Sequence, residues 1–206
     1  TLIKAEVIDE LAREAGVGDR VSTITERAMR GELDFAGSFR ERLALLRGLP
    51  EAALLSVLAR LELNDGAREL VAALRARDIP TAILSGGFDF FARHFAGALA
   101  MDHVFANALE VRDGAVTGRV CGAIVDGAFK RERLQSLTAE LGADARAAVA
   151  IGDGANDLPM LGAAGLGVAF RAKPRVRARA AASLDRNDLS AVTCLLGWPA
   201  SADPST

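Results

Sequence analysis

The stretch AIGDGAND, residues 150–157, decides the fold, because a hydrophobic run leads directly into a turn of two acids, an amide and two glycines. The run Ala147–Ile151 predicts a buried strand, and a helix is expected after the turn. In an open α/β sheet, ligands bind at the carboxyl ends of the strands. Asp153 and Asp157 would repel each other there unless a cation lies between them, and Mg²⁺ prefers such oxygen ligands. The alternative is structural: an Asp-Gly turn followed by an Asn-Asp helix cap.

Composition limits the classes of protein and partner. A chain of 206 residues fits one domain, or one domain with a sizeable insertion. The net charge of −2 gives no electrostatic reason to expect nucleic acid or a membrane surface as partner. The sequence has no apolar run of membrane-spanning length, no signal-peptide layout, and no metal-ligand spacing around Cys121 or Cys194. We therefore expect a cytoplasmic protein.

The first sixty residues carry only helical patterns. Apolar residues recur at spacings of three and four from Glu6 to Ala59, and turn residues divide them. The first predicted helix ends at Gly16, the second covers Asp19–Arg30, the third starts near Asp34, and Pro50 opens the fourth. Four short helices in succession predict a small bundle.

After Leu63 the pattern alternates between strands and helices. Such alternation implies a parallel sheet covered on both faces. We expect the tail from Pro199 to Thr206 to be disordered. The predicted strands are residues 81–84, 104–106, 108–111, 116–120, 147–151, 165–170 and 182–184, and the predicted helices are residues 66–77, 88–98, 130–141, 158–163, 189–196 and one from Pro174.

Two further segments have features of an anion site. Ser85-Gly86-Gly87 follows a predicted strand and leads into a helix, so a hydroxyl and exposed N–H groups would lie at a helix N-terminus. The alternative is a simple turn with Ser85 as the cap. Lys130 opens a predicted helix, where its charge opposes the helix dipole. A lysine at a helix start is usually a solvated surface residue. The alternative is that Lys130 is placed there to face an anion.

The order of these motifs resembles the haloacid dehalogenase superfamily of phosphotransferases and, within it, the phosphoserine phosphatases. Ser85 matches the second motif of the superfamily, Lys130 the third, and residues 153–157 the fourth. The N-terminal helices resemble the helical cap of those enzymes. The resemblance implies a Rossmann-like α/β core with a helical-bundle cap inserted after the first strand. It divides the chain into residues 1–4 (remnant of the first motif), 5–62 (cap), 63–198 (core) and 199–206 (tail).

The first motif of the superfamily, Asp-x-Asp-x-Thr, is incomplete in this sequence. Thr1-Leu2-Ile3 matches its end, so both aspartates would fall before Thr1, the nucleophile four residues upstream and the acid/base two upstream. The first core strand is therefore missing from the 206-residue sequence. We expect the polypeptide to extend upstream through a hydrophobic strand that ends in Asp-x-Asp.

The resemblance implies a Mg²⁺-dependent phosphomonoesterase that hydrolyses O-phosphoserine through an aspartyl phosphate, the last step of serine biosynthesis. Asp153 would bind Mg²⁺, and Asp157 would orient Lys130 or a metal-bound water. The groups implied to contact the phosphate are Ser85, Gly86 and Lys130, with Asn156 on the phosphate or the attacking water.

The resemblance also implies three cap residues that select the substrate. Glu6 would face the ammonium of phosphoserine, Arg42 would bind its carboxylate, and Phe35 would supply an apolar wall. Each has an ordinary alternative: an acid at a helix start, a solvated arginine and a core phenylalanine. Two other functions stay open, namely a phosphatase for a different small phosphomonoester, and a non-catalytic binding or regulatory domain if the two aspartates are absent from the gene product.

Overall fold

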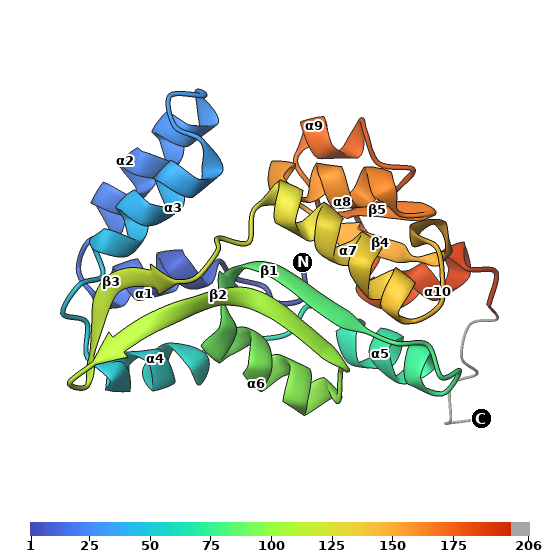
Figure 1. The fold of residues 1–206 in the computed structure, drawn as a ribbon, viewed down its shortest axis with the longest axis horizontal. Helices are drawn as coiled ribbons and strands as arrows, with labels where there is room; N and C mark the ends of the chain where they lie inside the picture. The colour runs from blue at the N-terminus through green and yellow to red at the C-terminus, as the bar shows by residue number, and fades with distance from the viewer. Residues whose placement is uncertain (199–206) are drawn as a thin grey trace.

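The computed structural model describes residues 1–198, and the tail at 199–206, for which we expect disorder, lies outside them. Four helices form a bundle at one end of the molecule, as expected from the apolar spacing (Figure 1). Asp34 caps the third helix, because its carboxylate accepts a hydrogen bond from Gly37 N–H at 2.6 Å. The bundle helices are α1 (Val7–Glu14), α2 (Gly18–Met29), α3 (Phe35–Ala44) and α4 (Glu51–Leu58).

A long β-hairpin joins the bundle to the rest of the protein. It consists of β2 (His103–Arg112) and β3 (Ala115–Cys121), which pair antiparallel. Val116 of β3 exchanges backbone hydrogen bonds of 2.8 Å with Gly48 and Leu49 in the loop before α4. Val116 is also buried in the same apolar cluster as the bundle. The bundle and this hairpin therefore share one core.

The prediction of two separate strands at residues 104–106 and 108–111 is wrong, because both segments belong to β2. Asn107 lies between them, and asparagine is rare in strands. Its side chain is fully buried and hydrogen-bonded in the structure. The strand continues through it because its polar atoms have partners.

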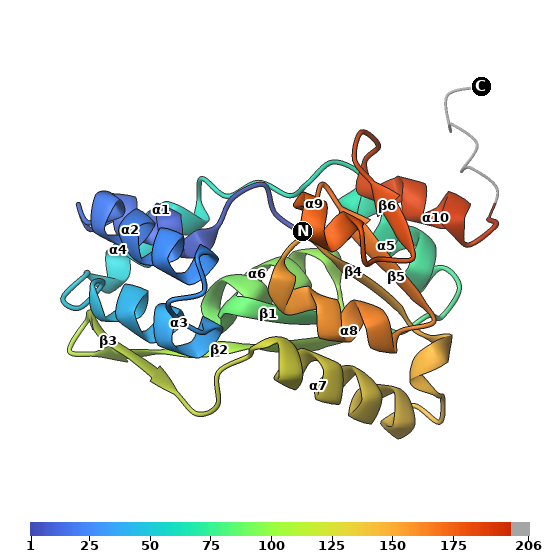
Figure 2. The ribbon, with the colours of Figure 1, turned by 90° about the horizontal axis from the view of Figure 1, so that it is seen from above.

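The expected parallel sheet is present as two halves. β1 (Ala82–Phe88) pairs parallel with β2, and β4 (Val149–Gly152), β5 (Leu166–Phe170) and β6 (Ala182–Leu184) form a separate parallel sheet. β1 and β4 are edge strands in the described part of the chain, and their residues line a common cleft. In Figures 1 and 2 the N-terminus lies between the two halves.

The remaining helices cover the two sheets. Within residues 1–198, no helix combines the length and the apolar character needed to cross a lipid bilayer. The helices are α5 (Ala67–Arg75), α6 (Asp89–Leu99), α7 (Gly127–Glu140), α8 (Leu158–Ala163), α9 (Pro174–Arg177) and α10 (Val192–Leu195), with 3₁₀ turns at Ala145–Ala147, Ala155–Asp157 and Leu189–Ala191.

Helix α7 begins three residues before the predicted start at Lys130. The carboxylate of Asp126 accepts a hydrogen bond from Phe129 N–H at 2.9 Å and so caps the helix. Lys130 is therefore one turn inside the helix, and its backbone N–H bonds to Asp126 O.

Candidate active site

A cleft of about 1650 Å³ lies between the helical bundle and the two half-sheets. It is bordered by the carboxyl ends of β1 and β4, which carry the Ser-Gly-Gly and Asp-Gly motifs. The structure brings every site residue predicted from the sequence into the lining of this one cleft. These residues are Glu6, Phe35, Arg42, Ser85, Gly86, Lys130, Asp153, Asn156 and Asp157.

Lys130 and Asp157 form a buried ion pair at the floor of the cleft. Lys130 Nζ lies 2.7 Å from Asp157 Oδ1, and each residue is only 5% exposed. Asp157 Oδ2 accepts hydrogen bonds from the backbone N–H groups of Asp153 and Gly154, at 3.0 and 2.9 Å. Asp157 thus contacts the Lys130 ammonium directly, and its role in orienting Lys130 stays a prediction. Lys130 is not the solvated surface residue that its position alone favours.

Asp153 presents the other carboxylate of this turn to the cleft. Its Oδ1 accepts a hydrogen bond of 2.6 Å from the Thr1 hydroxyl. Burial raises the pKa of Asp153, whereas the hydrogen bond from the Thr1 hydroxyl and the charge of Lys130 lower it. Asp153 therefore presents its carboxylate oxygens to the cleft as possible ligands for a cation.

The residues of this turn fit Mg²⁺ as a shared ligand. Within residues 1–198, no group of three or more His, Cys, Asp or Glu side chains is arranged to enclose a metal. Mg²⁺ does not need such an enclosure, because proteins usually hold it through one or two carboxylates, with water and substrate phosphate completing the octahedron. The half-exposed carboxylate of Asp153 suits that mode of binding.

Residues 85–87 belong to β1 but interrupt its pairing with β2, whose register shifts between Leu84 and Phe88, and this irregular part of the strand is called the Ser85–Gly87 loop. Ser85 Oγ accepts a hydrogen bond from Gly87 N–H at 3.0 Å. A Cβ atom at Gly86 would lie 2.9 Å from Phe35 Cζ and 3.4 Å from Asn156 Nδ2. Any larger residue at this position would have to displace the Phe35 ring, because the bundle, this loop and the Asp-Gly turn meet here.

Glu6 and Arg42 lie on the bundle side of the cleft. Burial, and then the charge of Asp153, raises the pKa of Glu6 above its ordinary value. Burial lowers the pKa of Arg42, although the carboxylates of Asp9 and Glu6 oppose this effect. Arg42 Nε donates to Ser38 O at 3.3 Å, and no carboxylate in residues 1–198 lies within 4.0 Å of its guanidinium. Arg42 is thus a partly buried cation that can accept a carboxylate ligand.

The sequence prediction missed a contact between the bundle and the core. Met29, at the end of α2, is 67% exposed, and its Sδ lies 4.0 Å from Lys173 Nζ. Met29, Lys173 and Arg175 also line the cleft. The basic run containing Lys173 has an alternating pattern typical of a solvated helix, so its sequence gives no sign of this placement.

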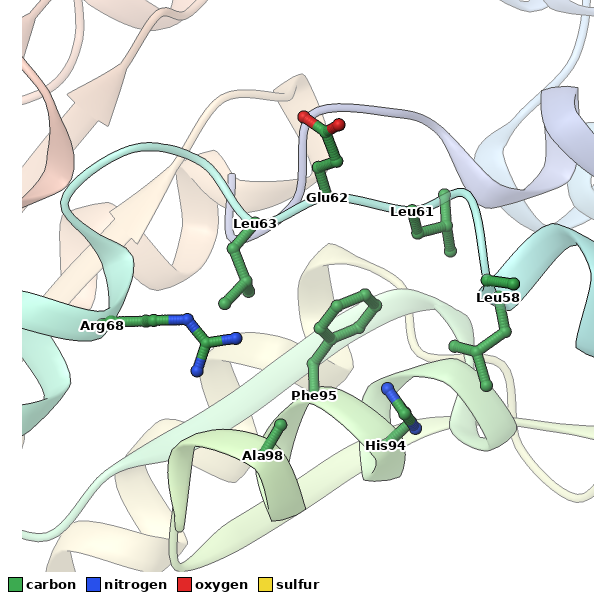
Figure 3. A pocket seen from close by; sticks show the side chains of 9 residues that line it. Leu58, Leu61, Glu62, Leu63, Arg68, His94, Phe95 and Ala98 are labelled. Atoms are coloured by element: carbon green, nitrogen blue, oxygen red, sulfur yellow. The ribbon is translucent and has the colours of Figure 1, made fainter.

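A second pocket of about 490 Å³ lies between the α4–α5 connection and α6 (Figure 3). Leu58, Leu63 and Phe95 form apolar walls, and Arg68 and His94 supply the basic groups. None of the predicted site residues belongs to this pocket. The groups suited to phosphate chemistry are gathered in the large cleft.

Comparisons with known proteins agree with this geometry. The family model described as haloacid dehalogenase-like hydrolase matches residues 1–162. A curated protein named phosphoserine phosphatase from Haemophilus influenzae is 48% identical over 196 residues, which cover 95% of this chain and 62% of that protein. One of the same name from Streptococcus thermophilus is 47% identical over 196 residues, covering 95% of this chain and 91% of that protein.

Solved structures give the same result. A structure described as a substrate-bound phosphoserine phosphatase complex superposes with a TM-score of 0.88 and 39% identity, covering 97% of this chain and 94% of the other. The chain spans only 62% and 58% of the lengths of the relatives from Haemophilus influenzae and Archaeoglobus fulgidus.

Proposed function

The chain belongs to the haloacid dehalogenase-like hydrolases, and from this premise we propose that it supplies most of the active site of a Mg²⁺-dependent phosphatase that converts O-phosphoserine to serine and phosphate. The observation that carries this proposal is the shared cleft. It places Ser85, Lys130 and Asp153, which suit a phosphate, opposite Glu6 and Arg42, which suit an amino acid. Phosphoserine combines these two chemistries in one small molecule.

The phosphate end is held by groups from two different elements. Lys130 and the Ser85 hydroxyl, with the Gly86 N–H, donate to the non-bridging phosphoryl oxygens, and Asn156 binds the phosphate or orients the attacking water. Asp157 keeps the Lys130 ammonium in place, as their 2.7 Å contact supports. Preorganised positive charge of this kind provides most of the catalysis in phosphoryl transfer.

Mg²⁺ would be held by Asp153 together with substrate oxygens. Its chemistry is to neutralise the charge on the phosphoryl oxygens, so that an anionic nucleophile can approach. The position of Asp153 in the lining of the cleft supports this assignment.

The attacking aspartate is proposed to come from an extended hydrophobic segment between β1 and β4. Two edge strands line the same cleft, β1 (Ala82–Phe88), which contains Ser85, and β4, which ends at Gly152 beside Asp153, and they support a parallel strand in this position. Its first aspartate would displace the serine oxygen from phosphorus and form an aspartyl phosphate. Its second would protonate the leaving serine oxygen and then remove a proton from the attacking water.

Mass spectrometry of the natural gene product tests this part of the proposal. We expect a mass above the 21.5 kDa of residues 1–206, and an Asp-x-Asp sequence directly before Thr1. An intact mass of 21.5 kDa would contradict the catalytic proposal and favour a binding or regulatory domain.

The substrate proposal is tested on the natural gene product with a set of phosphate esters. Phosphoserine should have a higher kcat/KM than a sugar phosphate or p-nitrophenyl phosphate, because these two esters lack the ammonium and the carboxylate that Glu6 and Arg42 are proposed to bind. Phosphate release should stop in EDTA and return on adding Mg²⁺. Full activity in the chelator, or a preference for the sugar phosphate, would refute the proposal.

Replacing Arg42 by alanine should damage activity on phosphoserine selectively. Loss of a charge-assisted contact to the substrate carboxylate should cost about 2–4 kcal/mol, or roughly 30- to 1000-fold in kcat/KM. Activity on p-nitrophenyl phosphate, which has no carboxylate, should hardly change. Arg40→Ala is the matched control, since Arg40 is an exposed arginine on the same helix. Equal losses on both substrates would mean that Arg42 acts on structure or chemistry.

The raised pKa of Glu6 predicts a pH dependence of substrate selection. Only ionised Glu6 attracts the ammonium of phosphoserine, so the contact is present above its pKa and is lost as pH falls through that pKa, which lies above the ordinary 4.5. The ratio of kcat/KM for phosphoserine to that for p-nitrophenyl phosphate should fall with decreasing pH in this range. Taking the ratio of the two kcat/KM values cancels most of the pH dependence that the two substrates share. Glu6→Gln should have a low ratio at every pH, and an unchanged profile would exclude this role.

We also propose a cytoplasmic location and a place at the end of serine biosynthesis. Cys121 and Cys194 are both exposed free thiols, which suits a reducing compartment.

A further inference from the structure

Asn107, in the middle of β2, is the most completely buried polar residue among residues 1–198, with 0% exposure. Its Nδ2 donates hydrogen bonds to Gly86 O at 2.8 Å and Gly87 O at 3.2 Å. Its Oδ1 accepts a hydrogen bond from Val125 N–H at 2.8 Å. One side chain thus joins two backbone segments that are far apart in sequence.

The first connection reaches the Ser85 hydroxyl. Because a trans peptide is planar, the Gly86 C=O and the Gly87 N–H of the same peptide point in opposite directions. When Asn107 holds the C=O, the N–H is directed away from β2, and there it donates to Ser85 Oγ at 3.0 Å. The hydroxyl oxygen is then an acceptor on this side, which leaves its hydrogen available for a ligand.

The second connection reaches Lys130. Val125 directly precedes Asp126, which caps α7, and Lys130 lies one turn inside that helix. Val125 also lies against the loop, since its carbonyl oxygen would be 3.4 Å from a Cβ atom at Gly86. The position of α7 relative to the Ser85–Gly87 loop is therefore fixed through the Asn107 amide.

We propose that Asn107 is a positioning residue that sets the separation between the Ser85 hydroxyl and the Lys130 ammonium, and so the fit of the cleft to a phosphoryl group. It does not itself touch the substrate. This inference rests on the proposed function only in taking a phosphate as the ligand of Ser85 and Lys130. It does not depend on which ester is hydrolysed.

The test compares Asn107→Leu with Thr81→Val in the natural gene product. Leucine is somewhat larger than asparagine and makes none of its hydrogen bonds. Thr81 is the matched control, because its buried hydroxyl bonds to Asp102 at 2.8 Å and joins the same two strands at their opposite end. Both variants should lose stability in urea unfolding, since each removes a buried hydrogen-bonded side chain between β1 and β2.

Only Asn107→Leu should change phosphate binding. By analogy with the loss of groups that orient a ligand, we expect inorganic phosphate to bind roughly 10- to 100-fold more weakly, with a similar loss in kcat. Calorimetric titration gives the affinity, and the amide resonance of Gly87 should move on adding phosphate in the unmodified protein and in Thr81→Val, but not in Asn107→Leu. Equal phosphate affinity in both variants would overturn the inference.

A measurement on the unmodified protein decides the matter if Asn107→Leu does not fold. The side-chain NH₂ signals of Asn107 and the amide signal of Val125 should shift on adding phosphate, and static signals would overturn the inference. A protein that shows these shifts but does not hydrolyse phosphoserine would contradict the proposed function and leave the role of Asn107 standing. If the unmodified protein hydrolyses phosphoserine but the folded Asn107→Leu variant binds phosphate with unchanged affinity, the proposed function stands and the role of Asn107 is overturned.

Discussion

Asp153→Asn is expected to lower kcat/KM for phosphoserine by about 10³-fold or more, and to remove the response of the enzyme to Mg²⁺. The physical reason is that asparagine keeps the shape of the side chain but loses the charge that attracts a divalent cation. Rates measured across a range of Mg²⁺ concentrations test this directly.

Asp185→Asn is a suitable control for the Asp153 variant. It makes the same change of charge at an exposed ion pair with Arg177, 3.0 Å long and outside the cleft. Its kcat/KM should stay close to that of the unmodified protein. An Asp153 variant with an unaltered Mg²⁺ response would show that the cation binds elsewhere.

Lys130→Met should lower the free energy of unfolding by about 3–5 kcal/mol, because it leaves Asp157 as a buried carboxylate without its cation. Activity should be lost as well. A double variant, Lys130→Met with Asp157→Asn, should recover much of the stability and none of the activity, because no buried charge then remains from this pair and the asparagine oxygen can still accept the hydrogen bonds from Asp153 and Gly154.

Urea unfolding of both variants, compared with Lys4→Met, separates this buried pair from a surface pair. Lys4 pairs with Glu62 at 3.2 Å in an exposed position, so its loss should cost no more than about 1 kcal/mol. A loss below about 1 kcal/mol for Lys130→Met as well would mean that the pair at the floor of the cleft is solvated.

Local patterns predicted the elements whose ends are marked by the sequence itself. The helix at residues 158–163 and the strand at 182–184 have the predicted bounds. The bundle also follows from apolar spacing, and the fourth helix from Pro50. The meeting of the Ser85 and Asp153 segments was predictable because the carboxyl ends of parallel strands meet at one edge of a sheet, whereas Glu6, Phe35 and Arg42 were predicted only from the family resemblance.

The errors have tertiary causes. Lys130 is buried because Asp157, 27 positions away, pairs with it, and no local pattern reports such a partner. In the sequence Asn107 suggests a break between two strands, although hydrogen bonds to Gly86, Gly87 and Val125 keep it inside one. The sequence does show a polar residue, Asn107, within an apolar stretch. Whether that residue ends the strand or lies inside it depends on hydrogen-bond partners that are distant in the chain.

The hairpin that carries the bundle has a mechanical consequence. β2 pairs with β1 as far as Asn107. From Ala108 onward, within residues 1–198, β2 pairs only with β3. The loop before α4 is also hydrogen-bonded to β3. A two-stranded ribbon at Ala108 therefore joins the bundle and the hairpin tip to the core, besides the chain connections before Val7 and after Leu58. Two-stranded ribbons twist more strongly than wider sheets. A change in the twist of this ribbon would therefore alter the separation of the bundle from the core, and with it the width of the cleft.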